Sequence, residues 1–280
     1  MPPRVVASDL DGTLLRSDGT VDPRSRRALR LAEEAGALVV LCTARPMRWM
    51  APLAEALGHS GIAICDNGAV LWDLYTESVL DAFPLEPALT RDVVRLLAEA
   101  IPGCAWAVER TTGYGREPHY VSRWPTPENS AIAAVERLIE EPSVKLMLRH
   151  DELLADELLG RAADVVGELA ELTHSNSGDG LLEISAAGIS KASTLARVCE
   201  QRGVRSEEVI AFGDMPNDLA MLRWAGHAIA VAGAHPDVLA AADEITASND
   251  EAGVAQVLER VFSDEVLRPI ARRKRAARGA

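Results

Sequence analysis

The chain has 280 residues, of which 48% are hydrophobic and 25% charged, and its formal net charge is −13. This length allows one large or two modest α/β domains with a proper hydrophobic core, and the negative charge argues against non-specific nucleic-acid binding. No apolar run approaches the roughly 20 residues of a membrane-spanning helix, and the first residues lack a signal-peptide pattern. We therefore expect neither a membrane nor a nucleic-acid partner.

The four cysteines are far apart in the sequence and form no CxxC pair. This spacing argues against a zinc site and against a disulfide framework, and it is typical of proteins from a reducing compartment. We therefore expect a cytoplasmic protein.

Short apolar runs alternate with helical patterns along the first part of the chain. We expect strands at 4–8, 37–42 and 61–65, helices at 22–36 and 46–58, and a hairpin at 68–83. The first helix has Asp22 as its N-cap, Pro23 at its first position and Gly36 at its end. This alternation predicts a mostly parallel, doubly wound, Rossmann-like sheet with helices on both faces.

The middle of the chain has a different pattern. It predicts helices at 87–100 and 151–166 with a further helix between them, strands at 103–110, 143–149, 170–176 and 180–185, and a Gly-, Arg- and Pro-rich loop at 111–127. We interpret this part as a smaller α/β domain, a cap, inserted into the first domain.

The alternation returns after the insertion. We expect helices at 190–203, 217–226, 235–242 and 249–262, and strands at 209–213, 227–231 and 244–246. The predicted domains are therefore a core at 1–81 and 187–264, an inserted cap at 82–186, and a disordered, solubilising basic tail at 265–280.

Two carboxylates stand one residue apart where the first strand ends, at Asp9 and Asp11. They repel each other, and neither has a basic neighbour in its own segment, so a cation from elsewhere must compensate. Ligands of open α/β sheets gather beyond the carboxyl ends of the strands. Three further segments occur at such ends or at helix starts, and they carry polar groups: Thr43 and Arg45; Lys191; and Asp214, Asn217 and Asp218.

Hard oxygen ligands of this kind suit Mg²⁺, which keeps some water and phosphate oxygens as further ligands. A calcium loop of the EF-hand type is excluded, because Gly12 stands fourth in the segment rather than sixth and Thr20 occupies the twelfth position. A metal, a lysine, a hydroxyl and a reactive carboxylate together indicate a site for a phosphoryl group.

Four motifs in order carry a resemblance to a known family. DLDGT at 9–13, TAR at 43–45, Lys191 and GDMPND at 213–218 resemble the motifs of the haloacid dehalogenase superfamily. The insertion between the second and third motifs resembles that of Cof-type phosphatases, as does NGA at 67–69. The family usually has glycine where this chain has Ala44, but the main-chain N–H that would contact phosphate is retained.

The resemblance implies a role for each motif residue. Asp9 would attack phosphorus and form an aspartyl-phosphate. Asp11 would protonate the leaving oxygen and then activate water, so it must carry a proton at first, which a nearby carboxylate and restricted solvent would favour. Lys191 would neutralise the developing charge. Mg²⁺ would be held by Asp9, the Asp11 carbonyl, Asp214 and, directly or indirectly, Asp218; the phosphoryl group would be held by Thr43, Ala44, Arg45, Lys191 and Asn217.

Simpler roles remain open for some of these residues. Asp218 and Asn217 are candidates for helix caps, and Arg45 for an exposed residue at a helix start.

The favoured function is a Mg²⁺-dependent phosphatase for a small phosphorylated metabolite, such as a sugar phosphate or a phosphorylated cofactor. The alternatives are a dedicated sugar-phosphate phosphatase, a sugar phosphomutase and a phospho-accepting signalling module. A mutase needs a second anion site in the cap, for which the candidates are Lys145, Arg149, Arg116 and Arg123; Arg116, His119 and Lys145 are also candidates for contacting the rest of the substrate. The sequence does not indicate the oligomeric state.

Overall fold

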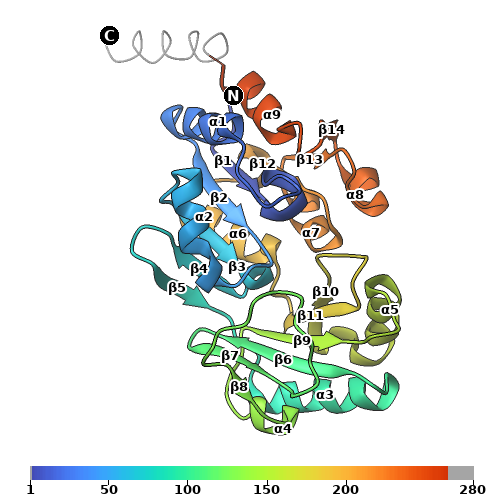
Figure 1. Cartoon of the computed structure of the whole chain (residues 1–280). Coiled ribbons are helices and arrows are strands. Elements are labelled where there is room, and N and C mark those ends of the chain that lie inside the picture. Colours follow the sequence, from blue (N-terminus) through green and yellow to red (C-terminus); the bar gives the residue numbers. More distant parts are fainter. Residues whose placement is uncertain (1, 264–280) are drawn as a thin grey trace.

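The computed structural model describes residues 2–263, so the basic tail predicted at 265–280 lies outside the described residues. Two sheets dominate the fold, one above the other in Figure 1. The larger sheet has eight strands in the order β14-β13-β12-β1-β2-β3-β4-β5. They are β1 (Val5–Ser8), β2 (Leu38–Cys42), β3 (Ile62–Cys65), β4 (Val70–Asp73), β5 (Ser78–Ala82), β12 (Val209–Gly213), β13 (His227–Val231) and β14 (Glu244–Thr246).

The larger sheet is parallel from β14 to β3, and the hairpin β4–β5 extends it antiparallel. Strand β1 lies in the middle: Val5 pairs with Val209 of β12 on one side and with Leu38 of β2 on the other. All four residues of β1 are buried, as expected for a parallel strand covered on both faces. The parallel sheet and the hairpin predicted from the sequence are therefore confirmed.

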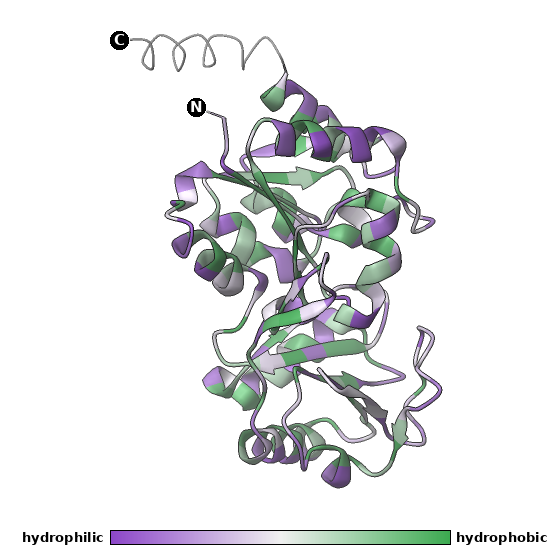
Figure 2. Ribbon diagram, turned by 90° about the vertical axis from the view of Figure 1, so that its left-hand side faces the viewer, coloured by the Kyte–Doolittle hydropathy of each residue, from purple (hydrophilic) through white to green (hydrophobic). Residues whose placement is uncertain are grey.

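Helices cover both faces of this sheet. One face packs against α1 (Pro23–Glu34), α2 (Met50–Leu57) and α9 (Gly253–Phe262), and the other against α6 (Lys191–Glu200), α7 (Leu219–Trp224) and α8 (Pro236–Ala241). Figure 2 shows hydrophobic residues concentrated in the strands and hydrophilic residues spread over the helices. The doubly wound architecture predicted from the alternating pattern is confirmed.

Helix α1 has the ends that its sequence predicts. The Asp22 carboxylate accepts a hydrogen bond from the Arg24 N–H, Pro23 is the first helical residue, and Gly36 follows the helix with a φ of 89°. An aspartate cap satisfies an N–H that has no partner within the helix, and a glycine adopts the left-handed conformation without a steric penalty.

The smaller sheet has six strands in the order β10-β11-β9-β6-β7-β8. They are β6 (Ala105–Arg110), β7 (Gly113–Arg116), β8 (Ala131–Ile132), β9 (Lys145–Arg149), β10 (Ala170–Thr173) and β11 (Leu181–Ala186), accompanied by α3 (Pro87–Ala100), α4 (Val135–Leu138) and α5 (Ala155–Val166). We call residues 82–186 the cap, and we propose that they form the inserted domain; its first residue, Ala82, is also the last residue of β5. Helices α3 and α4 lie on the side of this sheet that faces away from the larger sheet, and α5 lies beside β10 and β11 (Figure 1).

Two sequence predictions for the cap were wrong in detail. The segment 111–127, predicted as a loop, contains β7, because its residues pair with β6 and its Tyr114 side chain is buried. Pairing and burial therefore outweigh the low strand propensity of the two glycines in β7. Helix α5 begins at Ala155 rather than at residue 151, with Leu154 as the residue before its first turn.

Alternation along the cap strands gives their sheet two different faces. Leu146 and Leu148 of β9 belong to the hydrophobic cluster beneath the helices. Lys145 lies on the other face, which is turned toward the core in Figure 1. One side of the cap sheet is therefore buried under its own helices, and the other side combines charged residues such as Lys145 with a small hydrophobic cluster around Ala107 and Tyr114.

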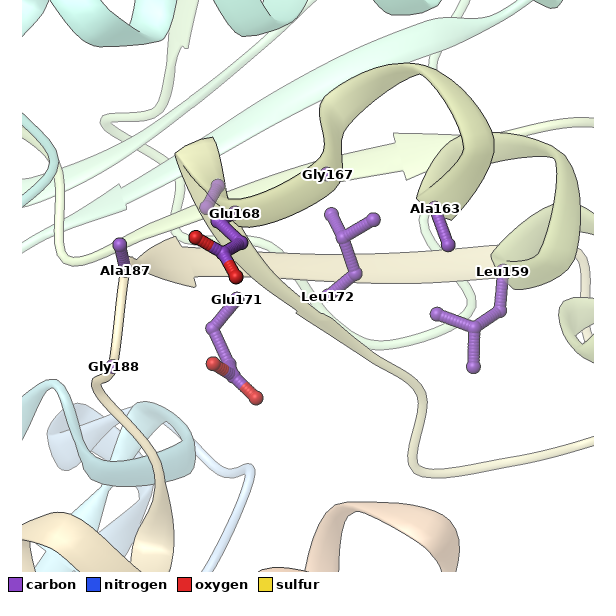
Figure 3. A pocket seen from close by; sticks show the side chains of 9 residues that line it. Leu159, Ala163, Gly167, Glu168, Glu171, Leu172, Ala187 and Gly188 are labelled. Carbon is purple, nitrogen blue, oxygen red and sulfur yellow. The ribbon is translucent and has the colours of Figure 1, made fainter.

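The chain enters the cap at the end of β5 and returns to the core through the segment 187–190. Figure 3 shows a groove at the return segment, lined by the end of α5, by β10 and by Ala187 and Gly188. None of the predicted site residues lines this groove. Among residues 2–263, no helix has the length and apolar character needed to cross a membrane.

Candidate active site

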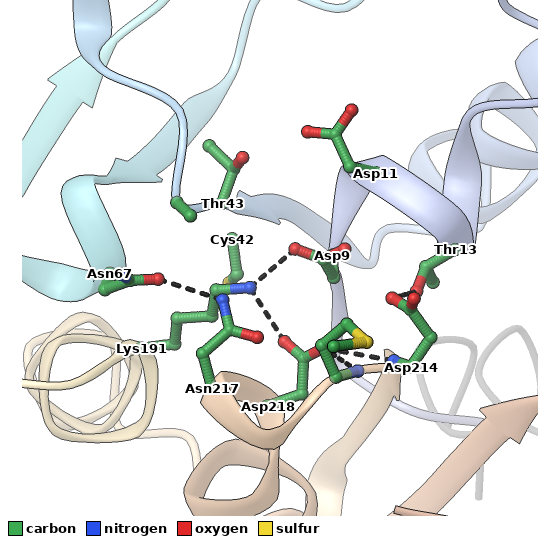
Figure 4. Close-up of polar contacts among 12 residues, drawn as sticks. Asp9, Asp11, Thr13, Cys42, Thr43, Asn67, Lys191, Asp214, Asn217 and Asp218 are labelled. Carbon is green, nitrogen blue, oxygen red and sulfur yellow. Dashed lines mark hydrogen bonds and ion pairs between the residues drawn. The ribbon is translucent and has the colours of Figure 1, made fainter. Parts of the chain in front are cut away.

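The predicted motif residues meet at one edge of the larger sheet. Asp9 directly follows β1, Thr43 follows β2, Asp214 follows β12, and Lys191 is the first residue of α6. Figure 4 shows these side chains around one small volume at the carboxyl ends of the strands. Parallel strands end at the same edge of their sheet, and therefore segments that are far apart in the sequence form a single site.

The turn after β1 brings the backbone close to Asp214. Gly12 has a φ of 79°, and a Cβ atom built on it would lie 2.3 Å from Asp214 Oδ2. Only glycine therefore fits this position without displacing the carboxylate. The next residue, Thr13, donates a hydrogen bond of 2.7 Å from Oγ1 to Asp214 Oδ1, which fixes the orientation of that carboxylate.

Lys191 joins two of the acids. Its buried ammonium group donates to Asp9 Oδ1 at 2.5 Å and to Asp218 Oδ1 at 2.8 Å (Figure 4). Burial opposes the charge of Lys191, but Asp218 and Asp9 outweigh that effect and raise the pKa of its ammonium. Burial also raises the pKa of Asp9 well above its ordinary value; Lys191 counteracts this effect, and the neighbouring carboxylates reinforce it. Lys191 therefore favours the charged form of Asp9 against its surroundings.

Three carboxylates in this site have the arrangement of a metal centre. One oxygen from each of Asp9, Asp214 and Asp218 lies within 4.8 Å of the others. Burial and then the charge of Asp218 raise the pKa of Asp214 to about 7. Three acids face one lysine, so a cation with a preference for oxygen ligands fits both the charge and the chemistry of the site.

Both carboxylate oxygens of Asp218 already accept hydrogen bonds within the protein, so Asp218 is less available to bind a metal than the other two acids. Its Oδ1 accepts from Lys191, and its Oδ2 accepts from the main-chain N–H groups of Asp214 and Met215 at 3.0 and 3.1 Å. Asp218 therefore holds both Lys191 and the loop that carries Asp214.

Asp11 lies in a different environment from the other acids. Its side chain is 53% exposed and receives two hydrogen bonds, of 2.6 and 2.7 Å, from the guanidinium group of Arg45. Figure 4 shows the Asp11 carboxylate turned away from Asp9. The restricted solvent expected around Asp11 is therefore absent in this structure, and its nearest charged partner is an arginine rather than a carboxylate.

The loop with Thr43, Ala44 and Arg45 is held by backbone hydrogen bonds. Thr43 is buried, and its Oγ1 accepts from the Arg45 N–H at 3.0 Å. The N–H groups of Asp66 and Asn67 donate to the Arg45 and Thr43 carbonyls at 3.1 and 3.0 Å. The loop is thus fixed on one side by the segment after β3.

Asn217 points into the site and is bonded to Asn67, a residue that was not predicted as a site residue. Its Nδ2 donates to Asn67 Oδ1 at 3.0 Å (Figure 4). Both side chains are buried, and Asn217 Oδ1 has no hydrogen-bond partner among the described residues. The Asn217 carbonyl oxygen is therefore left as an acceptor for a ligand, whereas the Asn67 amide also interacts with Glu183. The sequence feature that could have indicated Asn67 is the NGA segment at 67–69, which resembles that of Cof-type phosphatases.

The four cap cations proposed for a second anion site all have partners. Lys145 binds Glu183 and Asp66; Arg149 and Arg123 both bind Asp179; and Arg116 donates to main-chain carbonyls of its own loop, including that of Glu117. They therefore form no common site for a second phosphate group in this structure. His119, another candidate for substrate contact, is exposed and lies 3.5 Å from Glu117.

Comparison with known proteins gives consistent matches over nearly the whole chain. A family model described as haloacid dehalogenase-like hydrolase matches residues 6–258. A 5-amino-6-(5-phospho-D-ribitylamino)uracil phosphatase of Bacillus subtilis is 30% identical over 257 residues, covering 91% of this chain and 94% of its own. A pyridoxal phosphate phosphatase of Escherichia coli is 32% identical over 270 residues, covering 92% and 98%. The solved structure of a haloacid dehalogenase-like hydrolase from Bacillus subtilis superposes with a TM-score of 0.77 at 25% identity, covering 91% of this chain and 99% of its own.

Proposed function

The chain belongs to the haloacid dehalogenase-like hydrolases and is a phosphatase of small phosphorylated metabolites, and we propose that Asp9 is its nucleophile and Mg²⁺ its cofactor. The observation that carries the assignment of Asp9 is its hydrogen bond with Lys191. Because Lys191 favours the charged form of a buried carboxylate, one oxygen of Asp9 is ready to attack phosphorus.

In the first step an Asp9 oxygen forms a bond to phosphorus while the bond from phosphorus to the ester oxygen breaks. Asp11 donates a proton to the departing alkoxide. In the second step Asp11 takes a proton from water, the water oxygen attacks phospho-Asp9, and the Asp9 carboxylate leaves, so that inorganic phosphate is released. Lys191 and the donors of the loop at Thr43 compensate the charge that develops on the phosphoryl oxygens.

Asp11 starts from its pair with Arg45. A phosphoryl group at the loop of residues 43–45 competes for the guanidinium group, because a dianion attracts it more strongly than one carboxylate does. Arg45 then binds phosphate, and the Asp11 side chain is released to turn toward the leaving oxygen. This exchange accounts for the half-exposed position of Asp11, and the released carboxylate takes up a proton from solvent before it donates one to the leaving oxygen.

The residues that would hold Mg²⁺ are Asp9 and Asp214, together with the main-chain carbonyl of Asp11. Asp218 supports them through Lys191 and the main-chain N–H of Asp214. The bound ion would add positive charge next to the phosphoryl oxygens. The proximity of the three carboxylates, of which Lys191 bonds only Asp9 and Asp218, favours this assignment.

The substrate class is a phosphorylated cofactor or cofactor precursor, or a sugar phosphate. The two similar curated enzymes are named for a phosphorylated ribitylaminouracil and for pyridoxal phosphate. A phosphomutase is less well supported, because Lys145, Arg149, Arg123 and Arg116 are all engaged within the protein. A signalling module is disfavoured, since Asp11 would accelerate loss of the phosphoryl group.

The test is phosphate release from a panel of phosphorylated metabolites, with and without Mg²⁺. We expect turnover of at least one cofactor-type or sugar phosphate, and we expect chelation to abolish it. Turnover that survives chelation would exclude the proposed cofactor. A stable bisphosphate intermediate with transfer to a second sugar position would support the mutase instead.

A further inference from the structure

Lys145 is a cationic side chain that the reaction described above does not use. It begins β9 in the cap, is only 3% exposed, and lies on the sheet face opposite the hydrophobic cluster. An ammonium group that is removed from water is strongly destabilised unless partners replace the lost hydration. The groups that contact the Lys145 ammonium therefore show what role a buried positive charge has at this position.

These partners come from both domains. The ammonium group donates to Glu183 Oε1 of the cap at 2.8 Å and lies 3.3 Å from Asp66 Oδ1 of the core. It also donates to the main-chain carbonyl of Ala44 at 2.5 Å. Ala44 is the central residue of the loop that is proposed to bind phosphate, so a cap residue directly contacts that loop.

The Ala44 carbonyl belongs to the same planar peptide group as the Arg45 N–H. This N–H donates to Thr43 Oγ1 at 3.0 Å. Lys145 is therefore linked to the Thr43 hydroxyl through one rigid unit, and each hydrogen bond in such a chain strengthens the next. With Oγ1 accepting from Arg45, the hydroxyl hydrogen is free to point at a phosphoryl oxygen.

We propose that Lys145 is a positioning residue of the phosphate-binding loop: the cap brings its ammonium group to the Ala44 carbonyl, and the peptide held there orients the Thr43 hydroxyl. The inference rests on the proposed function. Lys145 reaches the loop only when the cap lies against the core. The phosphate site is therefore complete only in that arrangement of the two domains.

A double-mutant cycle tests this link, with p-nitrophenyl phosphate as the substrate. Thr43→Val removes the hydroxyl, and we expect kcat/KM to fall about 100-fold, as for the loss of one donor to a developing oxyanion. Lys145→Met is expected to reduce kcat/KM on the order of tenfold in the native background. In the Thr43→Val background the same change should cost less than about threefold, because no hydroxyl remains to be oriented.

Arg48 provides a matched control. Its guanidinium group also connects core to cap, through hydrogen bonds of 2.7 and 3.0 Å to Glu109, but it is not bonded to the loop of residues 43–45. Arg48→Met should therefore change kcat/KM by the same factor with and without the Thr43 hydroxyl. Should Lys145→Met unfold, the variant Lys145→Met/Glu183→Met removes opposite charges together and is expected to give the same coupling.

Two results would overturn the proposal: equal losses from Lys145→Met in both backgrounds, or coupling of Arg48→Met to Thr43 of the same size. The affinity for inorganic phosphate, measured by calorimetry in the same variants, gives a readout that does not need turnover. If the wild-type chain released phosphate from no ester, the proposed function would fail. The coupling in phosphate affinity would still decide the role of Lys145.

Discussion

Asp9 must be charged to act as a nucleophile, yet it is buried among other acids. The hydrogen bond from Lys191 resolves this conflict locally, and Asp218 keeps Lys191 in place. Replacing Asp9 with asparagine should therefore prevent nucleophilic attack on phosphorus. The asparagine side-chain carbonyl would still accept a hydrogen bond from Lys191. The site is fixed by these contacts rather than by the substrate.

We expect Asp9→Asn to lower phosphate release by at least about 10⁴-fold, because no other carboxylate occupies its place. The protein should remain folded, and a thermal unfolding curve would verify this. Asp92→Asn, at an exposed position of α3, is the control and should retain full activity. Residual turnover within tenfold of wild type would contradict the assignment of Asp9.

Asp66 gives a prediction about pH. Burial raises its pKa to about 7; Lys145 acts against this shift, and Glu109 and Glu183 add to it. A raised folded-state pKa stabilises the protein at low pH, and the contribution disappears as the pH rises through that value. We therefore expect Asp66 to contribute about 1 kcal/mol less stability at pH 8 than at pH 6.

Asp66→Asn should remove this part of the pH dependence, because the amide does not titrate. The measurement is urea unfolding of both proteins at pH 6 and pH 8, with the difference between them isolating Asp66 from other acids. An identical loss of stability in the two proteins would show that Asp66 does not titrate in this range.

At the scale of elements, the turn after β1 matters most. Gly12 and Gly19 both have a φ of 79°, but only at Gly12 would a Cβ meet the Asp214 carboxylate. Replacing either with alanine costs about 1–2 kcal/mol of backbone strain. Only Gly12→Ala should also displace Asp214, so we expect it to raise the Mg²⁺ concentration needed for half-maximal activity by tenfold or more.

Gly19→Ala is the matched control for this effect, since a Cβ at that position meets nothing within 4 Å. Activity as a function of Mg²⁺ concentration would be measured for both variants and compared with the wild type. Similar Mg²⁺ requirements for the two variants would mean that the contact between Gly12 and Asp214 is unimportant.

The sequence predicted most of the elements around the site, because their signals are local. The Asp22 cap, Pro23 and Gly36 define the ends of α1, and the apolar runs mark β1 to β3. Strand β7 was not predicted, because its glycines oppose a strand locally and its pairing with β6 decides the outcome. The contact between Asp11 and Arg45 was also beyond prediction, since it depends on side-chain orientation at two loops.

At the scale of the whole molecule, we propose that the cap limits the size of the substrate. Lys145 and Arg48 connect the two domains beside the site, and the linking atoms are largely buried. A substrate must fit beneath the cap when these contacts form, and closing a site over a substrate excludes bulk water.

We therefore expect phosphate release from pyridoxal phosphate or a sugar phosphate to exceed that from phosphoserine in a folded protein by at least about 10²-fold in kcat/KM. The comparison requires the same Mg²⁺ concentration and a common phosphate assay. Comparable rates on the two kinds of substrate would show that the cap does not enclose the substrate.

The sequence predicts an inserted segment, but it does not predict the contacts of that segment with the core. The strand alternation around Lys145 gives the face on which it lies, whereas the contact with Ala44 joins residues 101 positions apart. Such a pairing follows from how the two domains sit together, which no local pattern encodes. For this reason the sequence suggested Lys145 as a substrate contact, while its ammonium group is bonded within the protein.

The position of β1 between β2 and β12 also has a consequence for the order in which the molecule is made. The strands of the cap are contiguous from Ala105 to Ala186, so a ribosome completes the cap sheet before it adds β12. Until then β1 lacks one neighbour, and Asp9 has neither Lys191 nor Asp218 beside it. At roughly 5–20 residues per second, the growing chain carries a finished cap beside an unfinished core for a few seconds. The edge of β1 lacks this partner strand during the interval, and the active site can form only after Asp214 and Asp218 have been added.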